Sequence, residues 1–406
     1  MENIKMKNKG LGLVKPVKEL ISQEAKLDPF TWFEKMRVTQ PIRYDEERGC
    51  WDVFCYDDIL SILKNYNDFS SNRPEPVLVS SIIRMDPPRH TQMRGIISNA
   101  FTPRLIKDLE PRIKDIAGKL INETLVRESM EVIQDFSYAL AIIVIADLLG
   151  VPSEDHYLFK KWSDIIAKGA SDDSPSALKE VIREKNEVRE ELNNYFSRIV
   201  SERKRNPQND LITKLVEARI DGKGLTDIEI LEFCHLLLVA GNETTTNLIA
   251  NFIRRMAEDK SLEEQLRLNP GLIKNAIEET LRFYPPVLNT SRFAANDYKL
   301  RGHQINKGDQ IVLWIGSANR DEQQFENPNK FDINRSSIKH LTFGQSIHFC
   351  LGAPLARLEA QIAIQILLEM IKDIEFNTAK LNPIQSCLVY GCTTLPIKFK
   401  SFQCKS

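Results

Sequence analysis

The sequence is poor in the cysteine patterns that mark disulfide frameworks, zinc ribbons and redox dithiols. Its seven cysteines are an odd number at scattered positions, and no Cys-x-x-Cys pair occurs. Such usage argues against a disulfide scaffold. Cys50/Cys55 and Cys387/Cys392 share a four-residue gap, but no neighbouring histidines complete a tetrahedral zinc set.

An excess charge of either sign and a long apolar run are missing as well. The 55 basic and 56 acidic residues leave a formal net charge of -1, which argues against nucleic acid as the main partner. The longest apolar run, 139–146, is far shorter than the roughly 20 residues that cross a bilayer. The basic N-terminus lacks an apolar core of signal-peptide length. We therefore expect a soluble, cytoplasmic protein without a membrane span.

Internal repeats, low-complexity blocks and Gly/Ser linkers are also absent, so nothing divides the 406 residues. Apolar residues at three- and four-residue spacing predict helices at 105–125, 187–205, 227–241 and 271–284. Short strand-like pieces lie at 50–56, 298–305, 309–315 and 395–402, and the polar stretch 318–348 predicts an ordered meander. We expect a mainly α fold with small antiparallel β-sheets. A single domain at 29–406 would follow an N-terminal extension at 1–28.

One cysteine has unusual surroundings. Cys350 lies in "FGQSIHFCLG", two residues after His348 and two before Gly352, and "APLARLEAQIAIQILLEMI" after it predicts a long amphipathic helix. A free cysteine is most often a small buried hydrophobe. A helix N-terminus, however, offers unpaired N–H groups and a positive partial charge, which lower a thiol's pKa. The setting suits a nucleophilic or a metal-bound thiolate.

Two hydrolase interpretations of this loop fail. A cysteine hydrolase needs a histidine base within reach of the thiol, and a neighbour two positions away in a turn usually points elsewhere. Gly344, Ser346 and His348 partly match the G-x-S-x-G elbow of α/β-hydrolases, but the second glycine is missing. That fold also places its histidine after the serine, and His348 is the last histidine of the chain.

The pattern Phe-Gly-x-x-x-His-x-Cys-x-Gly followed by "APLARLE" resembles the haem-binding loop of the cytochrome P-450 superfamily in its bacterial soluble form. The resemblance extends from about Pro29 to the C-terminal strands, with most likeness to Bacillus-type hydroxylases. It implies the cytochrome P-450 fold, with haem b between a distal and a proximal long helix. Cys350 would be the axial thiolate ligand of the iron, in a loop that includes Phe343 and Gly352. A thiolate ligand favours O–O cleavage. The family usually has glycine where this chain has Ser346, and the absence of Cys-x-x-Cys-His excludes covalent c-type attachment.

The resemblance also assigns the residues that support the cofactor. The two haem propionates would be held by four cationic side chains: His90, Arg94, Arg292 and His348. His90 and Arg94 are four residues apart and so share one helix face. Glu-x-x-Arg occurs five times, but only Glu279/Arg282 is followed by "FYPPV" and Arg292. This pair, with Arg335, would form a structural rather than a catalytic network.

The segment "LLLVAGNETTTNLIA", 236–250, has two interpretations. In one, Gly241 and Asn242 break a helix and Thr244 to Thr246 start another. In the other, which the resemblance implies, one long distal helix crosses the haem face, and Ala240 and Gly241 leave room for O₂. Thr244 would bond back to the Ala240 carbonyl and distort the helix locally. With Glu243 it would relay protons, which favours O₂ over peroxide as the oxidant.

The substrate pocket is assigned by resemblance alone. Its wall would consist of Val79, Ile82, Ile83, Val239, Val287, Leu288 and Val389. These residues are aliphatic and no buried cation stands out among them, which favours a bulky apolar substrate of the steroid, terpenoid or fatty acid type.

The expected activity is therefore that of a haem-thiolate monooxygenase, which inserts one oxygen atom from O₂ into an apolar substrate. The length leaves no flavin or iron–sulfur domain, so electrons would come from a separate ferredoxin or flavodoxin and its NAD(P)H reductase, docking on the cysteine side. Two alternatives stay open: a non-enzymatic sensor or carrier with the same thiolate-ligated haem, and a helical interaction protein without a cofactor.

Overall fold

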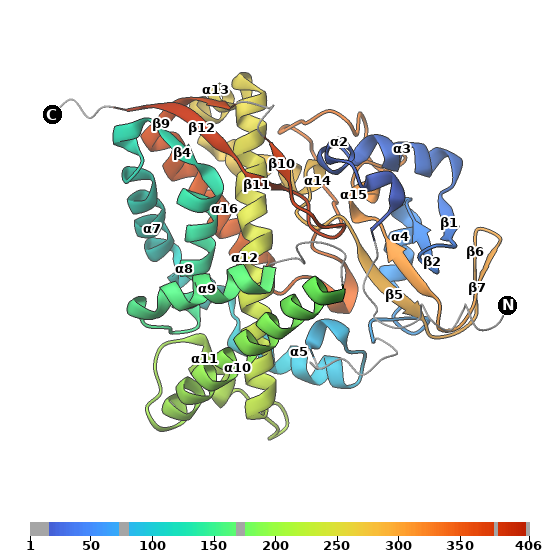
Figure 1. Ribbon diagram of the computed structural model, residues 1–406, viewed down its shortest axis with the longest axis horizontal. Coiled ribbons are helices and arrows are strands. Elements are labelled where there is room, and N and C mark those ends of the chain that lie inside the picture. The colour runs from blue at the N-terminus through green and yellow to red at the C-terminus, as the bar shows by residue number, and fades with distance from the viewer. Residues whose placement is uncertain (1–15, 73–80, 168–174, 377–380, 403–406) are drawn as a thin grey trace.

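The computed structural model describes residues 16–72, 81–167, 175–376 and 381–402, and helices dominate it (Figure 1). The longer helices are α5 (Arg89–Ala100), α7 (Glu110–Asn122), α8 (Tyr138–Leu148), α9 (His156–Ala167), α10 (Pro175–Arg205), α12 (Asp227–Glu258), α14 (Ile273–Phe283) and α16 (Ala353–Met370). The shorter ones are α2 (Gln23–Leu27), α3 (Phe30–Thr39), α4 (Tyr56–Lys64), α6 (Pro103–Asp108), α11 (Leu211–Glu217), α13 (Lys260–Leu268) and α15 (Ile315–Ala318). The predicted helices at 105–125, 187–205, 227–241 and 271–284 are confirmed as α6 with α7, α10, α12 and α14.

The strands are short and form small sheets beside the helices. They are β1 (Ile42–Asp45), β2 (Cys50–Val53), β3 (Phe69–Ser70), β4 (Ser129–Glu131), β5 (Thr290–Ala294), β6 (Tyr298–Leu300), β7 (His303–Ile305), β8 (Gln310–Leu313), β9 (Ile371–Phe376), β10 (Asn382–Pro383), β11 (Cys392–Thr394) and β12 (Pro396–Ser401). The largest sheet has the order β1-β2-β8-β5-β3. Its pairings are antiparallel except that β2 runs parallel to β8, and the predicted mainly α fold with small antiparallel sheets is confirmed. The four predicted strand segments are confirmed as β2, β6 with β7, β8 and β12.

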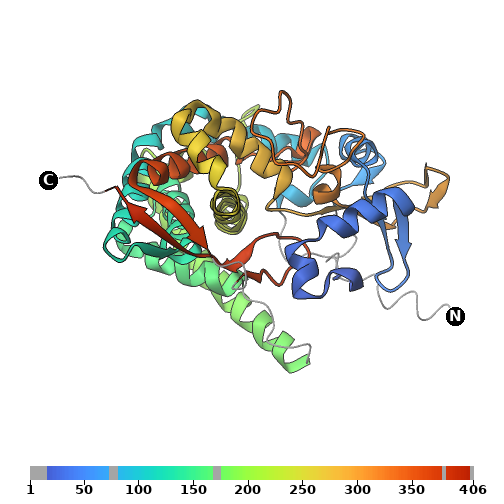
Figure 2. The same ribbon diagram turned by 90° about the horizontal axis from the view of Figure 1, so that it is seen from above.

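Helix α12 is the axis of the molecule, and Figure 2 shows it nearly end-on with the other helices around it. It starts at a capping box, in which the Thr226 side chain accepts the Glu229 N–H and Glu229 accepts the Thr226 N–H. It then runs unbroken from Asp227 to Glu258, so a helix break at Gly241 and Asn242 is wrong. Contacts with α8, α9, α10 and α16 outweigh the low helix propensity of one glycine.

The N-terminal residues that the structure describes pack on the main body. Val17 and Leu20 are buried in an aromatic cluster with Phe30, Phe33 and Trp314. A boundary between residues 28 and 29 stays a prediction. Among the described residues, no helix has both the length and the apolar character needed to cross a bilayer.

Candidate active site

The loop around Cys350 is a tight turn closed by backbone hydrogen bonds. The Cys350 N–H donates to the Phe343 carbonyl over 2.8 Å, after a short 3-10 helix, Ser346–His348. α16 begins three residues after the cysteine, and its first N–H groups, those of Gly352 and Ala353, point at the sulfur. This is the thiol at a helix mouth that the sequence predicts.

The acidity of this thiol differs from the prediction. Burial raises the pKa of Cys350, while the N–H groups of Gly352 and Ala353 and the nearby Arg94 lower it by less. The expected fall in pKa is therefore wrong for the thiol by itself, because desolvation of the charged form outweighs the helix terminus. The N–H groups still favour the anion.

Ser346 adopts a left-handed backbone with φ of 59°, where the resembling family has glycine. A side chain at positive φ costs roughly 1–2 kcal/mol, and glycine removes that strain at some cost in unfolded-state entropy. The Ser346 side chain is exposed, so little contact would be lost. We expect Ser346→Gly to raise the free energy of unfolding by up to about 1 kcal/mol, measured by urea denaturation. Gly344→Ser, which strains a second left-handed position of the same loop at φ of 70°, should lower the free energy of unfolding.

Four side chains from distant parts of the chain meet beside the cysteine loop. His90 and Arg94 come from α5, Arg292 from β5 and His348 from the loop. The rings of His90 and His348 have centroids 4.3 Å apart, and Arg94 donates to the Phe349 carbonyl over 2.6 Å. The structure thus brings together all four residues that the resemblance assigns to propionates.

This cluster has more donors than acceptors. The Nε2 atoms of His90 and His348 are buried and have no partner in the described part of the chain. Among the residues that the structure describes, the buried guanidinium of Arg292 donates only to the neighbouring Ser291 carbonyl, over 2.9 Å. Buried donors and cations without acceptors are costly. The cluster therefore fits a ligand that carries carboxylates.

The two histidines of the cluster are not cations, which corrects the sequence prediction. Burial, with Arg292 and His90 next, lowers the pKa of His348 to about 3. Burial also lowers the pKa of His90. Arg292, with its pKa lowered to about 10 by burial, keeps its charge at neutral pH. Two arginines and two neutral N–H donors make up the set.

Thr244 on α12 makes the hydrogen bond that the sequence predicts for it. Its hydroxyl donates to the Ala240 carbonyl over 2.7 Å. The expected local distortion is absent from the helix, which is α throughout. Beside Thr244, Glu243 is partly buried, and this burial raises the pKa of its carboxyl.

Ala240 and Gly241 face different sides of α12. Ala240 is exposed on the open side. A methyl group at Gly241 would lie 2.7 Å from Cδ1 of Ile145 on α8. The missing side chain of Gly241 therefore makes room for α8, and its expected role in leaving space for O₂ stays a prediction.

Two asparagines flank Glu243 and were missed from sequence. Asn242 is buried and donates to Ser163 on α9 over 2.7 Å. Asn247 donates to the Glu243 carbonyl over 2.8 Å. The four-residue spacing of Glu243 and Asn247 was an available signal, whereas nothing local pairs Asn242 with Ser163.

Three predicted wall residues come together where the C-terminal turn meets the segment after α14. Val287 and Val389 form a β-bridge, and the Leu288 N–H donates to the Leu388 carbonyl over 2.8 Å. Val239 lies on α12 and is 42% exposed. Among the described residues, no hydrogen bond or strand pairing joins Val239 to Val287, Leu288 or Val389.

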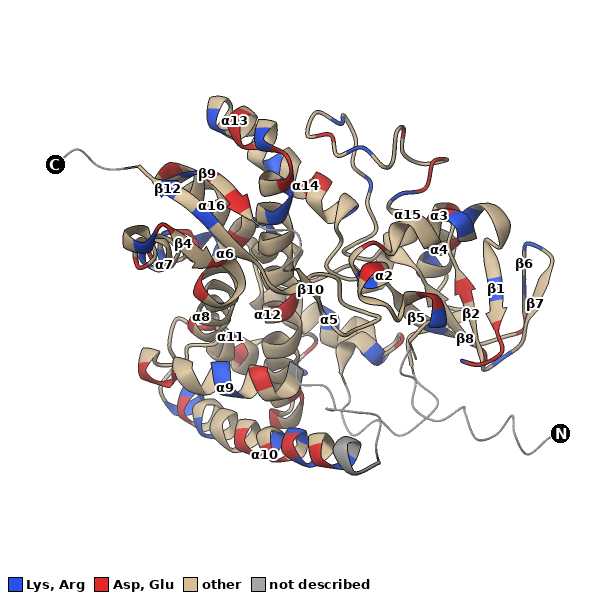
Figure 3. Cartoon of the chain, turned by 45° about the horizontal axis from the view of Figure 1, so that its top comes forward, with Lys and Arg blue, Asp and Glu red and all other residues tan. Residues whose placement is uncertain are grey.

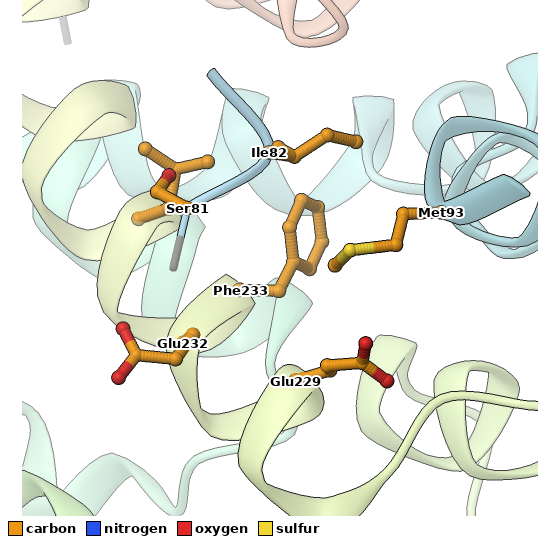
Figure 4. Close-up of a pocket in the computed structure, with 7 residues that line it drawn as sticks. Ser81, Ile82, Met93, Glu229, Glu232 and Phe233 are labelled. Carbon is orange, nitrogen blue, oxygen red and sulfur yellow. The ribbon is translucent and has the colours of Figure 1, made fainter. Parts of the chain in front are cut away.

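The other predicted wall residues lie before α5. Ile82 lines a shallow, closely packed crevice between residues 81–82, α5 and the first turns of α12, where the Phe233 ring lies beside Ile82 and Met93 (Figure 4). Ile83 is 55% exposed, and Val79 lies outside the described residues. Arg84 follows them, half-buried, and its side chain has no hydrogen-bond or ion-pair partner in the described chain. An unpaired cation in this loop was not expected.

The predicted Glu–Arg–Arg set is connected. Glu279 and Arg282 are fully buried and make two contacts, of 2.6 and 2.8 Å. Nε of Arg335 lies 3.4 Å from the same carboxylate. The set joins α14 to the meander at 318–348.

Comparison with known proteins identifies the class. The family model described as Cytochrome P450 matches residues 47–269 and 271–388, and the chain belongs to this family of haem-binding monooxygenases. "Cytochrome P450 109" of Bacillus spizizenii is 46% identical over 385 residues, 94% of this chain and 95% of that protein. Substrate-free CYP109E1 of Bacillus megaterium matches with a TM-score of 0.88 and 43% identity, covering 92% of this chain and 99% of that one. Its complex with corticosterone matches with a TM-score of 0.87 and 42% identity over the same shares.

Proposed function

We propose that this chain is a monooxygenase that binds haem b through the Cys350 thiolate. Thiolate-ligated haem supplies the activation of O₂ and the transfer of one oxygen atom to a substrate carbon. Arg94, Arg292, His90 and His348 hold the two propionates. The observation that carries this assignment is that the buried Nε2 atoms of His90 and His348 have no partner in the described part of the chain, beside an Arg292 guanidinium that donates there to one backbone carbonyl. Phe343 and Gly352 shape the loop, and Ala240 leaves the distal side open.

Glu243 and Thr244 move protons in this proposal. The Thr244 hydroxyl gives its hydrogen to the Ala240 carbonyl and keeps its lone pairs free to accept a proton or a water molecule. Glu243 is the adjacent ionisable group on α12, and its raised pKa brings it closer to neutral pH. An acid next to an alcohol on an open helix face favours reaction with O₂ over use as a sensor or carrier.

Thr244→Ala is expected to uncouple electron supply from product. Because proton transfer by a positioned group contributes roughly 10²–10⁴-fold, product per NADPH should fall at least about tenfold while NADPH consumption continues. Product and peroxide are measured together with saturating redox partners. Thr246→Ala is the matched control, since that hydroxyl contacts Asn242 on the side facing α9. Equal coupling in wild type and Thr244→Ala would contradict the relay.

The proposed substrate is an apolar molecule of steroid size. The aliphatic Val287, Leu288 and Val389 wall and the corticosterone complex of CYP109E1 support this class. Terpenoids and fatty acids are the competing classes. Of these two, the unpaired Arg84 favours fatty acids, because its guanidinium could bind their carboxylate. Titration of the low- to high-spin shift with corticosterone, a terpene and a fatty acid ranks them. The largest shift with corticosterone is expected, and a shift only with the fatty acid would replace the steroid proposal.

Electrons are proposed to come from a ferredoxin or flavodoxin and its NAD(P)H reductase. The donor would dock on the cysteine side, beside α16, the helix that follows the cysteine loop and against which α6 packs. Arg104 and Lys107 of α6 line a surface groove with Asp108 and Glu110. Basic side chains of this kind suit an acidic partner. A cytoplasmic location is part of the same proposal.

A further inference from the structure

Helix α10 lies across α12 and contacts it (Figure 1). Basic and acidic residues are interspersed along α10 (Figure 3). Two of its cations close ion pairs with α12: Arg189 with Glu232 at 2.9 Å, and Lys204 with Asp227 at 2.5 Å. Ion pairs between basic residues of α10 and acidic residues of α12 therefore form part of the contact between the two helices.

Helical spacing extends this charged contact to Glu243. Lys185 precedes Arg189 by four residues and shares its face of α10. Glu243 follows Glu232 by eleven residues, close to three full turns, and shares its face of α12. Lys185 and Glu243 are both half-buried. They are not within ion-pair distance of each other, unlike the Arg189 and Glu232 pair.

Lys185 is the only charged side chain among the described residues that acts on the Glu243 carboxyl. Burial raises the pKa of Glu243 and Lys185 lowers it. The effect is mutual, because burial lowers the pKa of Lys185 and Glu243 raises it. Lys185 has no hydrogen-bond or ion-pair partner of its own in the parts of the chain that are described. Its ammonium therefore has one electrostatic counterpart, the acid beside Thr244.

We propose that Lys185 is a positioning residue that keeps Glu243 ionised for proton transfer. The inference rests on the proposed function, in which Glu243 belongs to the relay. The carboxylate takes a proton from water and passes it to the Thr244 hydroxyl side, which restores its negative charge. Lys185 stabilises that charge from α10 and does not touch substrate or cofactor.

Lys185→Met tests the proposal through the pH profile. Removing the ammonium leaves burial unopposed, so the pKa of Glu243 rises and its carboxylate is lost at higher pH. The acidic limb of coupled product formation should move up by about one pH unit, as expected for loss of a nearby opposite charge. Lys185→Arg should keep the wild-type profile. Arg189→Gln, which breaks the neighbouring α10–α12 ion pair without facing Glu243, should also leave the limb in place.

A second measurement does not depend on turnover. Infrared difference spectra of each holoprotein against its Glu243→Gln version isolate the Glu243 carboxyl band, and its titration should shift upward in Lys185→Met only. Unshifted titration and profile in Lys185→Met would overturn the inference. A weaker substrate affinity, measured by the spin shift, with an unchanged pH profile would also overturn it, because Lys185 would then be a substrate contact. If Glu243→Gln itself leaves coupling intact, the relay has failed, which is a different result.

Discussion

Cys350→Ser is expected to abolish the carbon monoxide difference band that marks thiolate-ligated haem, together with monooxygenase activity. A serine hydroxyl has nearly the shape of the thiol but is far too weak an acid to supply an anionic ligand at neutral pH. The loop itself should survive the change. Its closing bond, from the Cys350 N–H to the Phe343 carbonyl, is a backbone bond. Loss of the band would then report on the sulfur and not on the fold.

The control for this variant is Cys55→Ser. Cys55 is also buried, and it is the N-cap of α4, where serine is a favoured residue. Its spectrum and activity should match the wild type. An unaltered absorption profile in Cys350→Ser would mean that the pigment is held by another residue. The assignment of the whole site would then be lost.

The parts of this site that depend on local spacing could be predicted from sequence. The loop around Cys350 and the His90 and Arg94 pair are short patterns whose geometry follows from a turn or a helix. In the structure, Cys350 lies in a turn before α16, and His90 and Arg94 lie on one helix, α5. The hydrogen bond from Thr244 to the Ala240 carbonyl could also be predicted from local spacing, because contacts between residues i and i−4 lie within one helix.

Burial and helix orientation could not be predicted in this way. The pKa of His348 and of Cys350 is governed by desolvation, which is set by distant segments that cover the loop. Ala240 and Gly241 are both small, but adjacent helical residues point about 100° apart. Only the packing of α8 shows which of them faces the open side.

Pairings between distant segments form a third group that sequence could not supply. The parallel alignment of β2 with β8 joins residues far apart in the chain. Lys185 comes close enough to act electrostatically on Glu243 only because α10 crosses α12. The five Glu-x-x-Arg matches are alike in sequence, yet only Glu279 and Arg282 have fully buried side chains that pair with each other.

Glu279→Gln is expected to lower the free energy of unfolding by about 3–5 kcal/mol, because it leaves a buried arginine without its counter-charge. Both Glu279 and Arg282 are fully buried, at 2.6 Å from each other. The carboxylate also accepts the Asp332 N–H over 2.9 Å, and Arg335 lies 3.4 Å away. Glutamine keeps the shape of the side chain, so the loss measures charge. Urea unfolding of the wild type and the variant gives the difference.

Glu264→Gln is the matched control, since it changes the same residue type in another Glu-x-x-Arg match. Glu264 is exposed, and Arg267 pairs with Glu263 instead, at 2.7 Å. A surface change of this kind should shift the free energy of unfolding by no more than about 0.5 kcal/mol. The Glu279→Gln protein that still folds should keep its coupling of NADPH to product, because Glu279 lies on α14 and not on the α12 face of Thr244. Normal stability with lost coupling would contradict the structural role and make Glu279 part of the chemistry.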